Sequence, residues 1–142
     1  MIKHHFSLIC GHAVIDERTK FLSIFDVIEQ IKVIAEPDQT VRIPMRFDLV
    51  SVWMKSDINN SENGISRISL CNPNGTSNNI CEVDIELTDS TFFRSIISFS
   101  GIELKGSGLY HFLIEFNQND HEWEKVSEIL FTVSYESPEK SS

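Results

Sequence analysis

The sequence predicts an all-β domain, an antiparallel β-sandwich of about eight strands with an immunoglobulin-like or C2-like arrangement. The composition is the first reason: 18 Ile, 9 Val and 10 Phe stand against two Ala. Branched and aromatic side chains favour strands, whereas Ala favours helices. In addition, apolar residues recur at every second position, and turn residues interrupt this alternation at short intervals. Both features are typical of half-buried strands joined by tight connections.

The first two expected strands are joined by a polar turn. The first strand covers residues 6–16 and the second covers 21–33, with Asp16–Lys20 as the hairpin connection. The second strand departs from strict alternation at Ile24, Phe25, Val27 and Ile28. This departure predicts a bulge or a change of the buried face.

A third strand is expected from the alternation over 41–49. One phase is apolar and faces inward: Val41, Ile43, Met45, Phe47 and Leu49. The other phase faces outward: Arg42, Pro44, Arg46 and Asp48. Pro44 has no N–H for a ladder, so it predicts an edge position or a bulge. The apolar phase then changes at Val50, Val52 and Met54, as in a strand that crosses from one sheet to the other.

The second half of the chain repeats the pattern. A polar loop over 55–64 precedes a strand over 65–71, the turn Asn72–Gly75 and a strand over 80–87. That last strand turns Cys81, Val83, Ile85 and Leu87 inward and Glu82, Asp84 and Glu86 outward. Further strands are expected over 92–104, 109–116 and 123–135, with a turn over 105–108. The last two have as inward residues Tyr110, Phe112, Ile114, Phe116, Ile129, Phe131, Val133 and Tyr135.

The length of 142 residues predicts a single sandwich domain over 1–136 and a disordered tail over 137–142. No apolar stretch is long enough for a membrane span, and no secretion signal is visible, so a cytoplasmic protein is expected. Cys10, Cys71 and Cys81 are odd in number and lack paired spacing. They predict buried free thiols and a reducing compartment.

The charge balance limits the classes of partner that the chain is expected to bind. The chain carries 12 basic and 21 acidic residues, a net charge of −9. Nucleic acids and anionic membranes both attract basic surfaces. The sequence therefore predicts that the chain binds neither nucleic acid nor a membrane. The remaining expectation is a protein partner or a homo-oligomer.

No motif predicts a catalytic, cofactor or metal site. There is no GxSxG elbow, and the five histidines have no motif partners. Cys10 and His12, with His4 or His5, supply half of a zinc pattern without a second pair. The carboxylates available for calcium stand apart in different loops: Asp57, Glu62, Asp89 and Asp120.

Two tryptophans are candidate anchors for a partner or ligand, because aromatic side chains dominate such contacts. Trp53 lies in an apolar segment and is expected in the core. Trp123 lies between Glu122 and Glu124 and is the candidate contact residue. The other candidate contacts are loop carboxylates: Asp57, Glu62 and Asp120.

Three stretches together resemble a known family. They are residues 6–16 (FSLICGHAVID), 22–28 (LSIFDVI) and 108–116 (GLYHFLIEF). In this order they are similar to a widespread family of small bacterial proteins catalogued only as a domain of unknown function. The resemblance covers residues 6–135 and implies a β-sandwich, no known activity and no functional residues. The chain has Ser23 where members often have Gly, and Glu36-Pro37 where they often have Phe-Pro.

The function expected from these observations is a non-enzymatic cytoplasmic interaction module. It binds a protein partner or self-associates through edge strands and end loops. The alternative is a module that binds a glycan or small metabolite through end loops and Trp123. A further alternative is an enzyme whose histidines and carboxylates converge from separate strands.

Overall fold

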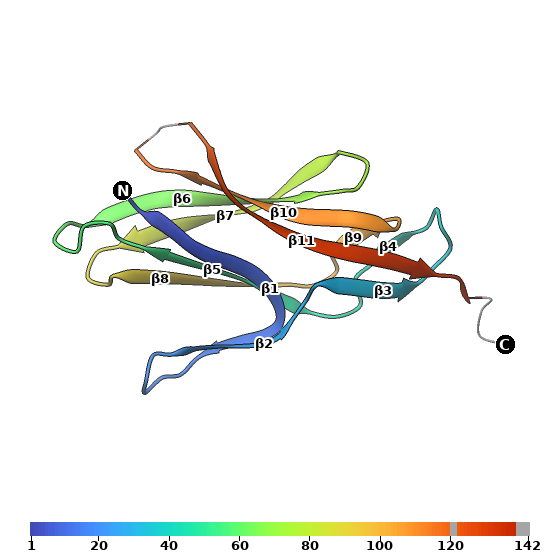
Figure 1. Cartoon of the computed structure of the whole chain (residues 1–142), viewed down its shortest axis with the longest axis horizontal. Coiled ribbons are helices and arrows are strands. Elements are labelled where there is room, and N and C mark those ends of the chain that lie inside the picture. Colours follow the sequence, from blue (N-terminus) through green and yellow to red (C-terminus); the bar gives the residue numbers. More distant parts are fainter. Residues whose placement is uncertain (120–121, 139–142) are drawn as a thin grey trace.

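The computed structural model describes residues 1–119 and 122–138 and confirms the β-sandwich (Figure 1). In this part of the chain there are eleven strands, more than the eight expected, because three predicted strands are each divided in two. They are β1 (Lys3–Ile15), β2 (Leu22–Val27), β3 (Gln30–Ile34), β4 (Thr40–Arg42), β5 (Phe47–Met54), β6 (Glu62–Cys71), β7 (Ser77–Leu87), β8 (Phe92–Phe99), β9 (Glu103–Lys105), β10 (Gly108–Asn117) and β11 (Glu124–Glu136).

Two main sheets form the layers. The four-stranded sheet has the order β2-β1-β5-β8, and the five-stranded sheet has the order β3-β11-β10-β6-β7. A small ribbon of β4 and β9 lies toward the end of the sandwich where Figure 1 marks the C-terminus. Neighbouring strands are antiparallel except β3 and β11, which pair in parallel with Ile31 beside Val133. The sandwich is therefore mixed, where the sequence predicted antiparallel pairing throughout.

The predicted strand over 21–33 is divided between the two sheets. β2 ends at Val27 in the four-stranded sheet, and β3 begins at Gln30 in the five-stranded sheet. Asp26 has a φ of 57°, in the left-handed region, where the chain leaves the first sheet. The interrupted alternation thus marks a change of buried face, one of the two outcomes it predicted.

The predicted strand over 41–49 is interrupted between Arg42 and Phe47. β4 ends before Pro44 and β5 begins after it, so the proline lies in a bend outside any ladder. A proline without an N–H ends the pairing instead of sitting at an edge or bulge. Met45, expected inward, is exposed because it belongs to this connection.

The change of phase predicted that this strand crosses from one sheet to the other, and that prediction is wrong for β5. It lies between β1 and β8, and both of its faces are buried. Leu49 and Trp53 point into the main core, whereas Val50 and Val52 belong to a second apolar cluster. Because both faces are covered, both phases are apolar. Asp48 was expected outward and exposed, yet only 6% of it is accessible.

Two other boundaries differ from the prediction. The stretch over 92–104 is split into β8 and β9, with Gly101 in the left-handed region between them at a φ of 72°. β6 begins at Glu62, so the polar loop ends at residue 61. Lys55, its first residue, is buried, and its Nζ donates to the Thr88 carbonyl at 2.8 Å, which gives the ammonium group a hydrogen-bond partner.

The hairpin of β6 and β7 is confirmed. The Gly75 N–H donates to the Asn72 carbonyl at 3.0 Å, and Gly75 has a φ of 92°, which glycine adopts without a steric cost. On β7, Ile85 and Leu87 are fully buried. The acidic stripe faces solvent as predicted, and its members are Glu82, Asp84 and Glu86.

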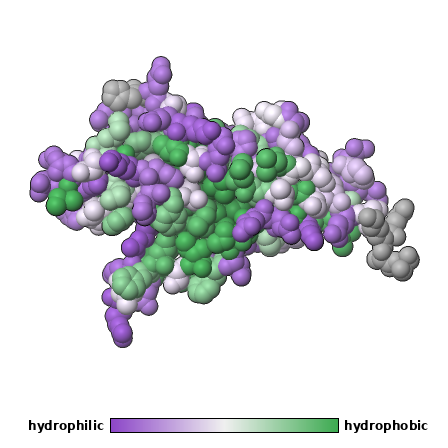
Figure 2. Space-filling model, viewed as in Figure 1, coloured by the Kyte–Doolittle hydropathy of each residue, from purple (hydrophilic) through white to green (hydrophobic). Residues whose placement is uncertain are grey.

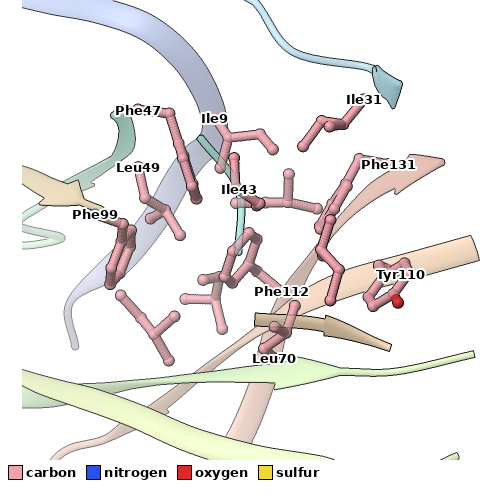
Figure 3. Close-up of a cluster of buried hydrophobic side chains, with 14 of the residues drawn as sticks. Ile9, Ile31, Ile43, Phe47, Leu49, Leu70, Phe99, Tyr110, Phe112 and Phe131 are labelled. Atoms are coloured by element: carbon pink, nitrogen blue, oxygen red, sulfur yellow. The ribbon is translucent and has the colours of Figure 1, made fainter. Parts of the chain in front are cut away.

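The core confirms the inward residues of β10 and β11. Figure 3 shows Phe112 in the middle of the cluster, between Phe99 on one side and Phe131 on the other. The rings of Phe112 and Phe131 are stacked with centroids 5.5 Å apart. Trp53 is buried as expected.

The three cysteines are free, as predicted. Cys10 is buried, whereas Cys71 and Cys81 are only partly buried, so the expectation of burial is right for one of the three. Burial is the largest cause of the raised pKa of each thiol.

Of the predicted tail, residues 139–142 lie outside the described part of the chain. Within that part, no helix is long and apolar enough to cross a bilayer.

Candidate functional site

Asp57, a predicted contact residue, is engaged inside its own loop. One carboxylate oxygen accepts the Asn59 N–H at 3.0 Å, and the other accepts the Asn60 side-chain amide at 2.6 Å. These are turn contacts between residues close in sequence. These contacts explain why an aspartate occupies this position, and no bound ligand is needed to explain it.

Glu62, the second predicted contact residue, is held by the start of the chain. Its Oε1 lies 2.6 Å from the amino group of Met1, and its Oε2 accepts the Ser56 N–H at 3.3 Å. The hydrogen bond from the amino group is the largest cause of the lowered pKa of Glu62. The side chain is 11% exposed, so it is already committed to a partner within the chain.

Trp123 comes directly before β11 and is partly buried. The Arg67 guanidinium carbon lies 4.1 Å above the ring centroid, and Arg67 is itself paired with Glu115 at 2.9 Å. One face of the indole is therefore covered by a cation. Asp120, the fourth predicted contact, lies outside the described residues, and the other three sit on separate elements with separate partners.

The zinc pattern does not assemble. Cys10 is buried in the second apolar cluster, whereas the His12 side chain is 66% exposed. Across residues 1–119 and 122–138, no group of three or more His, Cys, Asp or Glu side chains is placed to hold a metal ion.

The hairpin of β1 and β2 belongs to the four-stranded sheet, and it bends over the outer face of the other two strands, β5 and β8. Three contacts hold it there: the Ala13 N–H donates to Asp48 Oδ2 at 3.0 Å, the Arg94 guanidinium donates to the Lys20 carbonyl, and an apolar cluster lies between. The cluster joins Ala13, Leu22 and Ile24 of the hairpin to Val50, Val52 and Ile96 of the sheet. Strand alternation did not predict this arrangement, although the apolar second phase of β5 was a signal for it.

A small cavity of about 330 Å³ lies beside this hairpin, with Asp48 in its wall. Asp48 Oδ1 accepts the Ser98 hydroxyl at 2.6 Å, and Oδ2 lies 4.0 Å from His12 Nδ1. Gly11 and Arg46 also line this cavity. Both carboxylate oxygens already accept hydrogen bonds from the chain, so the geometry makes Asp48 a tether for the hairpin.

The hairpin exposes large apolar side chains on both of its faces. Val14 and Phe25 point away from the sheet, whereas Ile15 is opposite Leu22 in the register and shares its face. Five large apolar side chains between residues 14 and 27 are from 39% to 71% exposed. We call them the hairpin patch, and they are Val14, Ile15, Phe21, Phe25 and Val27. Figure 2 shows a continuous hydrophobic area where Figure 1 places β1 and the connection from β2 to β3; the hairpin projects below this area and carries both hydrophobic and hydrophilic residues.

A chain of polar side chains lies near the N-terminus. His4 Nε2 is 2.7 Å from the Ser7 hydroxyl, which is 2.8 Å from the Ser51 hydroxyl. Burial, followed by the nearby His5, lowers the pKa of His4, which favours the neutral imidazole. A base beside a hydroxyl is one part of a nucleophilic site. In the described residues, no carboxylate hydrogen-bonds to this imidazole to orient it, so the constellation is incomplete.

Comparisons with known proteins bear on the fold alone. No family model matches the chain, and no curated protein matches it. Among solved structures, it is similar to a β-glucosidase from Listeria innocua in complex with glucose, with 6% identity, a TM-score of 0.52 and 76% of this chain covered. The same enzyme in complex with gluconolactone gives 6% identity, a TM-score of 0.53 and 95% coverage. The chain spans only 15% to 16% of the length of that enzyme. This likeness is one of β-rich architecture.

Proposed function

We propose that this chain is a non-enzymatic interaction module that binds a protein partner or a second copy of itself. The observation that carries the proposal is the hairpin patch, five exposed apolar side chains gathered on one projecting element. Contiguous apolar surface on a small domain marks interaction sites, whereas single exposed apolar residues need no explanation. Aromatic side chains such as Phe21 and Phe25 are common anchors of interfaces.

The local charge supports the same role. The turn of the hairpin has two acidic residues, Asp16 and Glu17, and two basic residues, Arg18 and Lys20, so its net charge is zero on a chain of −9. A partner that contacts this turn therefore meets no net local charge.

The free thiols fit a reducing compartment, and we propose a cytoplasmic location on that basis. We also propose that the chain belongs to the family of small bacterial proteins catalogued only as a domain of unknown function. It rests on the three stretches that resemble that family.

The test replaces one aromatic residue of the patch. Phe25→Asp puts a charge on the side of the hairpin that points away from the sheet, and Ile58→Asp is the matched control, because Ile58 is also exposed (71%) but lies in the loop before β6. Light scattering measures self-association, and affinity capture followed by mass spectrometry measures partner binding. We expect Phe25→Asp to lose the association that wild type and Ile58→Asp share. A monomeric wild-type chain that retains no specific partner would refute the proposal.

A further inference from the structure

A hollow lies on the flank of the sandwich, where the chain passes from one sheet to the other. Its volume is about 780 Å³, within the range of about 300–1,000 Å³ that is typical of ligand pockets. β2 and β3 are the outermost strands of their sheets, and the connection between them lines the hollow. We call it the flank hollow, and its lining includes Asp26, Val27, Ile28, Glu29 and Met45.

The flank hollow presents apolar side chains to solvent. Val27 is 53% exposed and Met45 is 42% exposed, whereas Ile28 packs partly against the main core. Val27 also belongs to the hairpin patch, so the two surfaces adjoin. The hydrophobic area of Figure 2 lies at the same connection from β2 to β3. Contiguous apolar surface of this kind marks a contact with another molecule.

The charged part of the lining is entirely acidic. Asp26 and Glu29 are both exposed, and no Lys, Arg or His among the described residues lines the flank hollow. In the same part of the chain, neither carboxylate forms an ion pair. Arg46 follows Met45 in the sequence but lines the neighbouring cavity beside Asp48. The flank hollow therefore combines two unpaired carboxylates with exposed apolar side chains.

We propose that the flank hollow binds an extended segment of a partner protein in which a lysine or arginine stands between apolar residues. The apolar residues of this segment contact Val27 and Met45, and its cationic side chain pairs with Asp26 and Glu29. The aliphatic stem of a lysine or arginine covers apolar surface while its charged end reaches a polar group, so such a side chain matches both parts of the lining. The inference rests on the proposed function, because it names the chemistry of the partner beside the hairpin patch.

The charge and the openness of the flank hollow both favour this occupant. A net charge of −9 on each copy opposes a second copy and repels nucleic acids and anionic membranes, but it attracts a cationic segment. A bound small molecule is usually enclosed over most of its surface. The flank hollow is open instead, because all of its lining residues except Ile28 are exposed. A chain segment that continues from the hollow onto the hairpin patch covers both surfaces at once.

The test removes the two charges and keeps the shapes of the side chains. Asp26→Asn with Glu29→Gln removes two of the 21 acidic residues, so the net charge changes from −9 to −7. Asn tolerates the left-handed backbone of Asp26. The matched control is Asp84→Asn with Glu86→Gln on β7, which changes the net charge equally at the opposite edge of the five-stranded sheet. Both double variants should melt as wild type does, since all four carboxylates are exposed.

The probe is a random peptide library displayed on phage. We expect the wild-type chain to enrich peptides that place Lys or Arg between apolar residues. Fluorescence polarisation then measures the affinity of the most enriched peptide. It should bind Asp26→Asn with Glu29→Gln about tenfold more weakly, the size expected of two charge pairs at the rim of an interface. The β7 control should bind it as wild type does.

Three results overturn the inference: no enrichment, enrichment of peptides without a basic residue, or equal binding of the peptide by the two double variants. Self-association of wild type that Asp26→Asn with Glu29→Gln abolishes also overturns it, because a second copy would then occupy the flank hollow. An association that Phe25→Asp loses and this double variant keeps would leave the proposed function standing. No association by any measure would end both.

Discussion

The backbone N–H of Ala13 donates to the carboxylate of Asp48 at 3.0 Å, across 35 positions of sequence. This bond ties the hairpin of β1 and β2 to the outer face of β5. It holds the hairpin patch in a fixed place, with the apolar side chains of Ala13 and Ile24 turned toward the sheet. An interaction surface on a hairpin depends on such a tether, because a loose hairpin would lose entropy on binding.

We expect Asp48→Ala to lower the free energy of unfolding by about 1–3 kcal/mol, because it leaves the buried Ala13 N–H without its acceptor and removes the hydrogen bond from the Ser98 hydroxyl. Asp84→Asn is the control, since Asp84 faces solvent, and it should change stability by no more than about 0.5 kcal/mol. Urea unfolding measures both. Equal stability of the two variants would show that the hydrogen bonds of Asp48 do not stabilise the domain.

Phe112→Ala and Phe131→Ala should each destabilise the domain by about 3–5 kcal/mol, because both rings are buried and truncation leaves a cavity. The two rings stack on each other, so the double variant should lose less than the sum of the single losses. Denaturant unfolding of the three variants checks this. Near wild-type stability of both single variants would contradict the assignment of the core.

Stability should fall as the pH is lowered below 6.5, the ordinary pKa of histidine, in part because of His4. Its folded pKa is lowered, mainly by burial, so the unfolded chain binds the proton more readily in this range. The stabilising effect of the neutral imidazole is therefore complete above 6.5 and is lost as the pH falls through the folded pKa. His4→Gln should flatten this slope in thermal unfolding between neutral and mildly acidic pH. An identical slope in the variant would argue against the assignment.

Trp123→Ala should cost about 0.5–1 kcal/mol, the size of a cation–π contact at a partly exposed site. Chemical denaturation of the variant measures this loss. The same variant tests the alternative of a glycan or metabolite site. A ligand that raises the melting temperature of wild type but not of Trp123→Ala would favour that alternative over the interaction module.

The alternation of the sequence was sufficient to predict which side chains of β7, β10 and β11 point inward. Tyr110, Phe112, Ile114 and Phe116 are all buried, because each strand has one covered face and its side chains alternate. The composition likewise predicted the all-β class. The β6–β7 turn followed from Asn72–Gly75, whose residue types suit only a few backbone conformations.

Only the tertiary structure decided how the strands divide between the sheets and what covers their outer faces. Alternation predicted that Asp48 faces solvent and that the strand crosses between sheets at Val50, yet both side chains are buried beneath the hairpin, which is distant in sequence. Periodicity reports the two faces of a strand, but it carries no information on which distant segment lies against each. The same limit applies to function: the predicted contacts Asp57, Glu62 and Trp123 have partners within the chain, while the hairpin patch and the flank hollow exist only through the arrangement of the strands.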